Sequence, residues 1–99
     1  MLRYATAFCL LAAPSPLMAQ DKTDLCHTTG AITKAAVVAR VDGLNAPDTT
    51  QSIIQSLPND KDGFKPAVSP IVDWVYTLPK DQLDDDTVSK AYVAACLGQ

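Results

Sequence analysis

The chain has 99 residues, of which 8 are basic and 11 are acidic, and its formal net charge is −3. This length suffices for one domain and no more. All 11 acidic residues are aspartates, and an acidic chain disfavours binding to nucleic acids and anionic lipids, because both require a basic surface.

The first 19 residues have the pattern of a secretory signal peptide. Arg3 lies in a short start, residues 5–13 form an apolar run, and residues 14–19 form a small-residue exit. The run is too short to cross a bilayer, which takes about 20 apolar residues. Cys9 lies in the middle of the run, whereas a lipoprotein cysteine lies at its end. We expect cleavage after residue 19, leaving a single domain of residues 20–99 with no membrane span, located in the periplasm or secreted.

Only two cysteines remain after cleavage, Cys26 and Cys96. An exported protein meets an oxidising compartment, where such a pair can form a disulfide. Closing a loop of this length constrains the unfolded chain by roughly 4 kcal/mol on the chain-entropy model. The mature part carries 7 basic residues against 11 aspartates, a formal charge of −4.

Helical spacing of apolar residues predicts a first helix over about residues 24–42. Thr23 or Asp24 would cap its start, and Gly43 would be the left-handed residue past its end. One apolar stripe is expected on this helix. It comprises Leu25, Ile32, Ala36 and Ala39.

A second helix is expected from the cap Asn45 to about Ser56. Its apolar side would consist of Ile53, Ile54 and Leu57. Residues 58–66 (PNDKDGFKP) are predicted to form a loop, in which Phe64 is the one large apolar residue. Phe64 is therefore a candidate for contact with a partner.

The third helix is expected to take Ser69 as cap and Pro70 as its first residue, and to end before Pro79. An earlier start near Lys65 is disfavoured, because it would place a proline ring inside the helix.

Two aromatic residues of the third helix, Trp74 and Tyr76, are two positions apart and cannot both face one core. One of them should lie near the surface, so both are candidate partner-binding residues. The fourth helix is expected from near Asp84 to Gly98, with aspartates at the positive end of its dipole. Its expected stripe comprises Val88, Ala91, Tyr92, Ala95 and Cys96.

The disulfide constrains the topology, because it joins the first turn of the first helix to the last turn of the fourth. Four helices in up-down-up-down order meet this requirement with short connections. The sequence therefore predicts a small all-α, four-helix up-down bundle closed by Cys26–Cys96. A three-helix version, with the second segment reduced to a turn, is the alternative.

Several residues invite a chemical interpretation that their spacing does not support. Residues 60–63 resemble the middle of a calcium loop, but Pro58 and Ser69 occupy its first and last ligand positions. His27 is the only histidine, and solvent exposure is expected for it. Asp84–Asp86 are explained by a helix start. We expect no catalytic residue, no metal site and no cofactor.

Four short motifs mark the mature part. They are Cys26-x-x-x-Gly30, Ala39-Arg40-x-x-Gly43, Val75-Tyr76 and Tyr92-x-x-x-Cys96. With these motifs the chain resembles a group of short exported proteins of Gram-negative bacteria, mostly without known function. The resemblance implies a small helical periplasmic protein with one disulfide. In size and chemistry the chain is also similar to periplasmic immunity proteins, and to acid-stress chaperones, whose cysteines lie closer together.

The leading hypothesis is an exported, non-catalytic interaction protein, such as an inhibitor or immunity protein, that binds another protein. The alternative is a small periplasmic stress or acid-responsive chaperone, in which protonation of aspartates loosens the bundle. An enzyme is not expected.

Overall fold

The computed structural model describes residues 16–99, with side chains from Lys22 onward. Four α-helices and two short 3-10 helices follow one another along the chain. They are α2 (Pro16–Val41), α3 (Ala46–Ser56), η1 (Asn59–Phe64), α4 (Lys65–Val75), η2 (Lys80–Gln82) and α5 (Asp85–Leu97). No strand forms within residues 16–99. The predicted signal peptide lies outside the described residues except for its last four, which belong to α2, and it stays a prediction.

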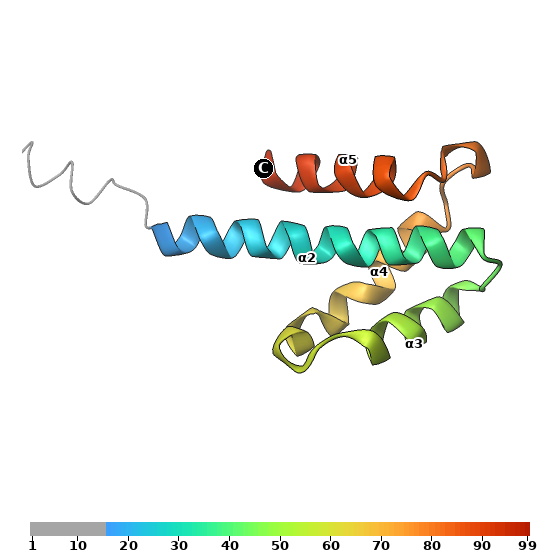
Figure 1. Ribbon diagram of the computed structural model, residues 1–99, viewed down its shortest axis with the longest axis horizontal. Helices are drawn as coiled ribbons and strands as arrows, with labels where there is room; N and C mark the ends of the chain where they lie inside the picture. Colours follow the sequence, from blue (N-terminus) through green and yellow to red (C-terminus); the bar gives the residue numbers. More distant parts are fainter. Residues whose placement is uncertain (1–15) are drawn as a thin grey trace, which may run out of the picture.

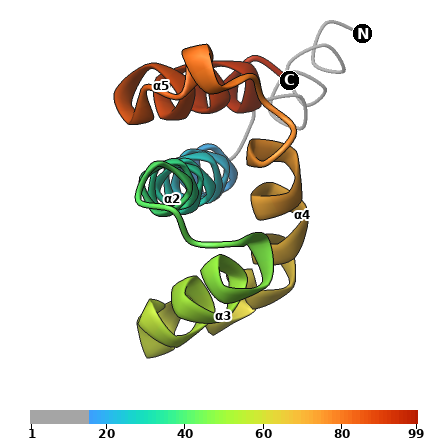
Figure 2. The same cartoon turned by 90° about the vertical axis from the view of Figure 1, so that its right-hand side faces the viewer.

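The four α-helices form the predicted up-down bundle, with α2 at its centre (Figure 1). Figure 2 looks nearly along α2 and shows α5 on one side of it, α3 on the opposite side and α4 on a third. The disulfide joins Cys26 of α2 to Cys96 of α5, with an S–S distance of 2.04 Å and a Cα–Cα distance of 5.6 Å. The four-helix prediction with one disulfide is confirmed, and α3 rules out the three-helix alternative.

Helix α2 begins earlier than the sequence predicts, at Pro16 rather than at Thr23 or Asp24. Proline suits the first turn of a helix, and the residues after it contain no helix breaker before Gly30. Cys26 therefore lies in the third turn of α2 and not in its first. The end of α2 agrees with the prediction, since Gly43 has a φ of 96°.

The stripe predicted for α2 is partly wrong. Leu25 is 48% exposed, and Ala39 is only partly buried. Thr29 and Thr33 are buried instead, because their hydroxyls donate to the backbone carbonyls of Leu25 and Thr29, at 2.8 and 2.9 Å. A threonine bonded in this way can enter a core without an unsatisfied polar group.

The core lies between α2, α3 and α4, with a contribution from α5. Its buried residues are Ile32, Ala36, Val37, Ile53, Val68, Ile71, Val72, Val75 and Val88. At the α2–α5 contact Gly30 is buried, and a Cβ atom placed on it would collide with Cγ2 of Val93. The two helices therefore meet over a glycine.

Helix α3 has the predicted cap, because the Asn45 side chain accepts a hydrogen bond from the Asp48 N–H at 2.8 Å. Ile53 is buried, and Ile54 and Leu57 pack against the core, as predicted.

The predicted loop and the predicted start of the third helix are wrong. Residues 59–64 form η1, and α4 begins at Lys65 with Pro70 inside it. Pro66 fits the first turn of this longer helix, and the added turn buries Val68 completely. Burying a valine contributes roughly 1.5 kcal/mol or more, which offsets part of the cost of an internal proline.

Helix α5 is capped by Asp84, whose carboxylate accepts from the N–H groups of Asp86 and Thr87. Its buried side differs from the predicted stripe, because Ala91 and Ala95 are exposed whereas Val93 is partly buried against Gly30. In the described part of the chain, none of the helices has the length and apolar character needed to cross a membrane.

Candidate interaction surface

Trp74 is the exposed member of the aromatic pair of α4, with 42% of its surface accessible. Its ring lies 6.1 Å from that of Tyr92 on α5. Trp74 also lines a groove of about 470 Å³ between α4 and α5, together with Asp81 and Asp84. The expectation that one aromatic lies near the surface is therefore met by Trp74.

Tyr76 holds the bundle together at the end of α4. Its hydroxyl donates to the carbonyl of Leu44 at 2.6 Å and lies 2.7 Å from the Thr49 hydroxyl. Arg40 donates to the carbonyls of Val75 and Leu78, at 2.8 and 2.6 Å, and its guanidinium lies 5.6 Å from the Tyr76 ring centroid. Arg40 thus ties α2 to the end of α4 and to the segment that follows it, and Tyr76 ties the same end of α4 to Thr49 of α3.

Phe64 is half-buried at the end of η1 and packs against the core. The Lys61 ammonium lies 5.7 Å from its ring centroid. The structure thus places the three predicted partner-contacting residues apart: Phe64 at one end of α4, Trp74 on its α5 side and Tyr76 within a hydrogen-bond network. Their role in partner binding stays a prediction.

One side of α2 is uncovered by any described element, as Figure 2 shows. The side chains at 3- and 4-residue spacing on this side are all exposed, and we call them the open face of α2. The open face consists of His27, Ala31, Ala35 and Val38. Val38 has 42% of its surface accessible, and Ala31 and Ala35 are exposed on the same side. An apolar stripe of the central helix therefore lies in solvent.

A groove of about 490 Å³ runs along one edge of the open face, between α2 and α3. Its walls are mostly apolar or hydroxyl-bearing side chains. From α2 come Thr28, Ala31, Ile32, Ala35 and Ala39, and from α3 come Thr49, Ser52, Ile53 and Ser56. His27, Pro58 and Lys61 lie at the end of the groove that is nearest the start of α2.

A second groove, of about 380 Å³, runs along the other edge, between α2 and α5. His27 and Ala31 line both grooves, so the open face forms the ridge between them. From α5 the second groove receives Ser89, Lys90, Val93, Ala94 and Leu97.

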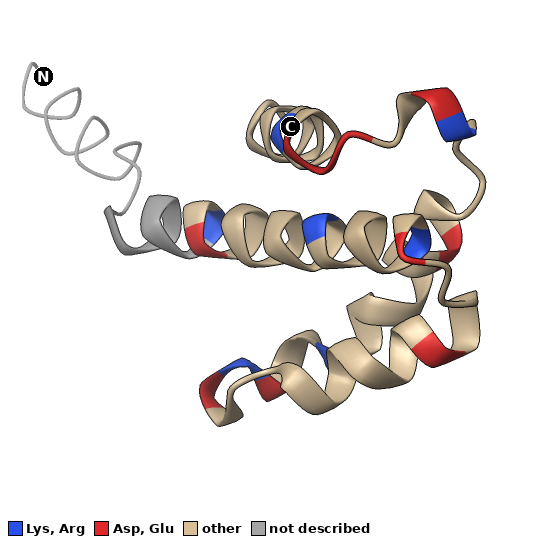
Figure 3. Ribbon diagram, turned by 45° about the vertical axis from the view of Figure 1, so that its right-hand side comes forward, with Lys and Arg blue, Asp and Glu red and all other residues tan. Residues whose placement is uncertain are grey.

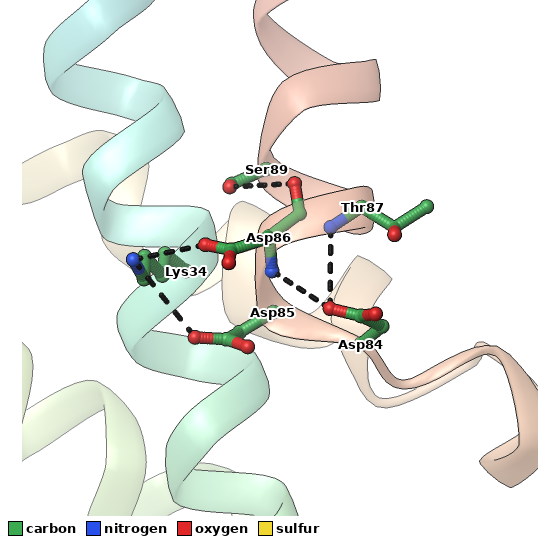
Figure 4. A network of polar contacts seen from close by, with 6 residues as sticks. All are labelled: Lys34, Asp84, Asp85, Asp86, Thr87 and Ser89. Atoms are coloured by element: carbon green, nitrogen blue, oxygen red, sulfur yellow. Dashed lines mark hydrogen bonds and ion pairs between the residues drawn. The ribbon is translucent and has the colours of Figure 1, made fainter.

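Figure 3 shows a basic segment in the middle of α2 and acidic residues at the start of α5. Lys34 lies 3.1 Å from Asp86 and 4.0 Å from Asp85 (Figure 4). The hydrogen bond to Asp86, and the charges of Asp86 and Asp85, raise the pKa of Lys34 above its ordinary value of 10.5. These pairs are exposed, so they orient α5 on α2 more than they stabilise it.

Sequence reasoning missed both grooves. The signal that could have found them is the spacing of Ala31, Ala35 and Val38. These residues form an apolar stripe on the side of α2 opposite its buried threonines. The sequence alone does not show that this stripe is uncovered, because nothing in it says how many helices surround α2.

Within the described residues, no group of three or more His, Cys, Asp or Glu side chains is close enough to hold a metal ion. His27 is exposed, as expected. No protein-family model, no curated protein and no solved structure matches the chain.

Proposed function

We propose that this chain is an exported, non-catalytic protein that binds another protein, as an inhibitor or immunity protein does. The observation that carries the proposal is the open face of α2, an exposed apolar ridge between two grooves. Exposed apolar surface on a small protein marks sites of interaction. A ridge flanked by grooves offers a complementary shape to a partner's side chains.

The rigidity of the bundle supports the same role. The disulfide joins α2 to the last turn of α5, Arg40 joins α2 to the end of α4, and Tyr76 joins that end to Thr49 of α3. A surface held in one conformation loses little entropy when it binds. The Cys26–Cys96 disulfide also supports an exported location, because disulfides persist in oxidising compartments.

The side chains that line the two grooves support a non-catalytic role. Their ionisable groups are His27, Lys34, Lys61 and Lys90. Of these, Lys34 and Lys61 are held in ion pairs. In the described part of the chain, His27 makes no hydrogen bond to Ser52, Ser56 or Ser89, the three serines that line the grooves, whereas a nucleophilic serine is activated by an adjacent base.

Site-directed photocrosslinking in the native host tests the proposal. A photoreactive phenylalanine analogue at Val38 on the open face should give one abundant crosslinked product that contains a second protein, identified by mass spectrometry. The same analogue at Ala95, an exposed residue of α5 outside both grooves, is the control and should not give this product. The proposal fails if neither position yields a second protein.

The acid-responsive chaperone is a second candidate, favoured by the polar character of the α2–α5 contact. Gly30, which carries no side chain, and the Lys34–Asp86 pair both contribute to it. Loss of this ion pair in acid would weaken one of the contacts that orient α5 on α2. A titration by circular dichroism and a hydrophobic dye tests this candidate, and an unchanged fold without dye binding down to about pH 2 would exclude it.

A further inference from the structure

The ionisable side chains that line the two grooves beside the open face are basic, although the protein is acidic. The α2–α3 groove is lined by His27 and Lys61, and the α2–α5 groove by His27, Lys34 and Lys90. Neither groove has an aspartate in its lining, although the chain carries 11 of them and a formal net charge of −3. The α4–α5 groove has the opposite character, with Asp81 and Asp84 and no basic residue.

The four basic groups differ in how far they are already neutralised. Lys61 pairs with Asp24 at 3.0 Å and Lys34 with Asp86 at 3.1 Å. Lys90 makes no ion pair within the described residues and is exposed, as is His27. The surface therefore offers at least one free positive charge at its α5 edge, and complementary charge selects a partner and its orientation.

The dimensions of the open face match a helix. Residues 27 and 39 bound the α2 wall of the larger groove, and twelve steps of about 1.5 Å give a length of about 18 Å, or just over three helical turns. The ridge between the grooves carries Ala31 and Ala35, and such small side chains let helix axes approach to the short end of the usual ~8–10 Å range. Two grooves beside one ridge can receive two rows of side chains from a docked helix.

We infer that the open face of α2 binds an acidic amphipathic helix of the partner protein, which completes the ring of helices around α2. This inference rests on the proposed function and specifies the chemistry of the partner segment. The apolar side of that helix lies over Ala31, Ala35 and Val38, and its side chains enter the two grooves. Its acidic residues flank the apolar side, and those along the α5 edge pair with Lys90.

Two designed peptides of about 18 residues test the chemistry without knowledge of the partner. Both carry leucine at helical i, i+3, i+4 and i+7 positions. One has glutamate beside the leucine stripe, and the other has lysine at the same positions. The acidic peptide should shift the amide resonances of residues 27–38 in an NMR titration of the disulfide-bonded protein, and it should bind roughly tenfold or more tightly than the basic peptide.

Matched variants locate the binding surface. Ala35→Glu should abolish binding of the acidic peptide, whereas Ala95→Glu, on an exposed part of α5 outside both grooves, should leave it unchanged. Lys90→Glu should weaken binding by roughly threefold to tenfold, whereas Lys80→Glu, at an exposed lysine that lines neither groove, should have a smaller effect. Circular dichroism of each variant verifies that the fold is kept.

Three results would overturn the inference. They are equal binding of the two peptides, no binding of the acidic peptide, and binding that Ala35→Glu does not reduce. Sedimentation of the protein alone adds a fourth: a dimer that Ala35→Glu dissociates would mean that a second copy of this chain covers the open face. If crosslinking recovers a partner whose binding Ala35→Glu leaves intact, the proposed function stands and only this site assignment fails.

Discussion

Replacing Gly30 with alanine should destabilise the protein, although alanine is the better helix former. The added Cβ would collide with Cγ2 of Val93, whereas non-bonded carbons prefer to lie about 3.5–4.0 Å apart. Valine on a helix is nearly restricted to one χ1 rotamer, so Cγ2 cannot turn away and α5 must shift from α2. Overpacking of this kind destabilises a protein by about 1–3 kcal/mol, whereas the higher helix propensity of alanine stabilises the helix by about 1 kcal/mol relative to glycine. The expected net loss is about 1 kcal/mol.

The substitution Val93→Ala tests whether this collision causes the loss, because it removes Cγ2. The next atoms near a Cβ on Gly30 are the Ser89 carbonyl oxygen and the Val93 Cβ, both at 3.8 Å, an ordinary contact distance. In the Val93→Ala background, Gly30→Ala should therefore stabilise the protein by up to about 1 kcal/mol. The same substitution changes sign between the two backgrounds.

Urea denaturation followed by circular dichroism measures all four members of this cycle, with the disulfide intact. Gly63→Ala is the control, because no atom lies within 4 Å of a Cβ at that position, and it should not destabilise the protein. The reasoning is refuted if the effects of the two substitutions add to within about 0.5 kcal/mol, as they do for independent sites.

Three further outcomes are expected. Reduction of the Cys26–Cys96 disulfide, whose partners are 70 residues apart, should lower the free energy of unfolding in urea by about 4 kcal/mol on the chain-entropy model. Asp84→Ala removes the acceptor of two backbone N–H groups at the start of α5 and should cost about 1 kcal/mol in the same measurement. Asp86 raises the pKa of Lys34 above 10.5. The stability that this pair contributes is therefore fully present below pH 10.5 and is lost as the pH rises through the higher folded-state pKa. In that window the difference in the free energy of unfolding between the protein and its Lys34→Met variant should shrink.

The capping prediction has a matched control, and each of the three has an outcome that would contradict it. Asp60 is an exposed aspartate of η1 that makes no side-chain hydrogen bond or ion pair with any of the described residues, and Asp60→Ala should stay within about 0.5 kcal/mol of the unchanged protein. An equal loss for Asp60→Ala and Asp84→Ala would contradict the capping argument. A reduced protein as stable as the oxidised one would contradict the disulfide estimate, and a stability difference for Lys34→Met that stays constant above pH 10.5 would contradict the assignment of the ion pair.

The parts of the fold that were predictable are those decided by neighbouring residues. The cap of α3 needs only Asn45 and an N–H three residues later, and the end of α2 needs only a residue that tolerates positive φ, which Gly43 supplies. The disulfide was predictable for a different reason, since the predicted cleavage leaves two cysteines and therefore one possible pair.

The start of α4 was not predictable from local rules, because two such rules oppose each other there. Pro70 disfavours a helix that passes through it, and Pro66 favours a helix that begins just before it. The outcome depends on Val68, which the longer helix buries completely. The sequence around residues 65–70 does not show that a core lies above Val68.

The buried side of α2 was mispredicted for a related reason. Thr29 and Thr33 count as polar in a hydropathy pattern, yet each hydroxyl is satisfied by a carbonyl of its own helix. Leu25 counts as apolar, yet nearly half of its surface is exposed. The α2–α5 contact is formed over Gly30, and a glycine carries no hydropathy signal that would predict it.

The candidate site was also only partly predictable, because it depends on how the helices pack around α2. That one of the α4 aromatics is exposed follows from their spacing of two residues, and Trp74 is that residue. The exposure of Ala35 and Val38 could not be predicted in this way. It depends on the number of helices around α2, because a helix on the fourth side would have covered both residues. An exposed stripe on the central helix is an unusual feature of a bundle, and this is why α2, rather than the aromatic residues of α4, carries the proposed interaction.

The early start of α2 is compatible with the predicted removal of residues 1–19. Cleavage there would shorten α2 by four residues, to begin at Gln20. The side chains of residues 22–25 are all exposed, and Cys26 is the first buried residue of the described part of the helix. Cleavage would therefore leave the disulfide, the Gly30 contact and the open face of α2 in place, and each of these features would belong to the mature protein.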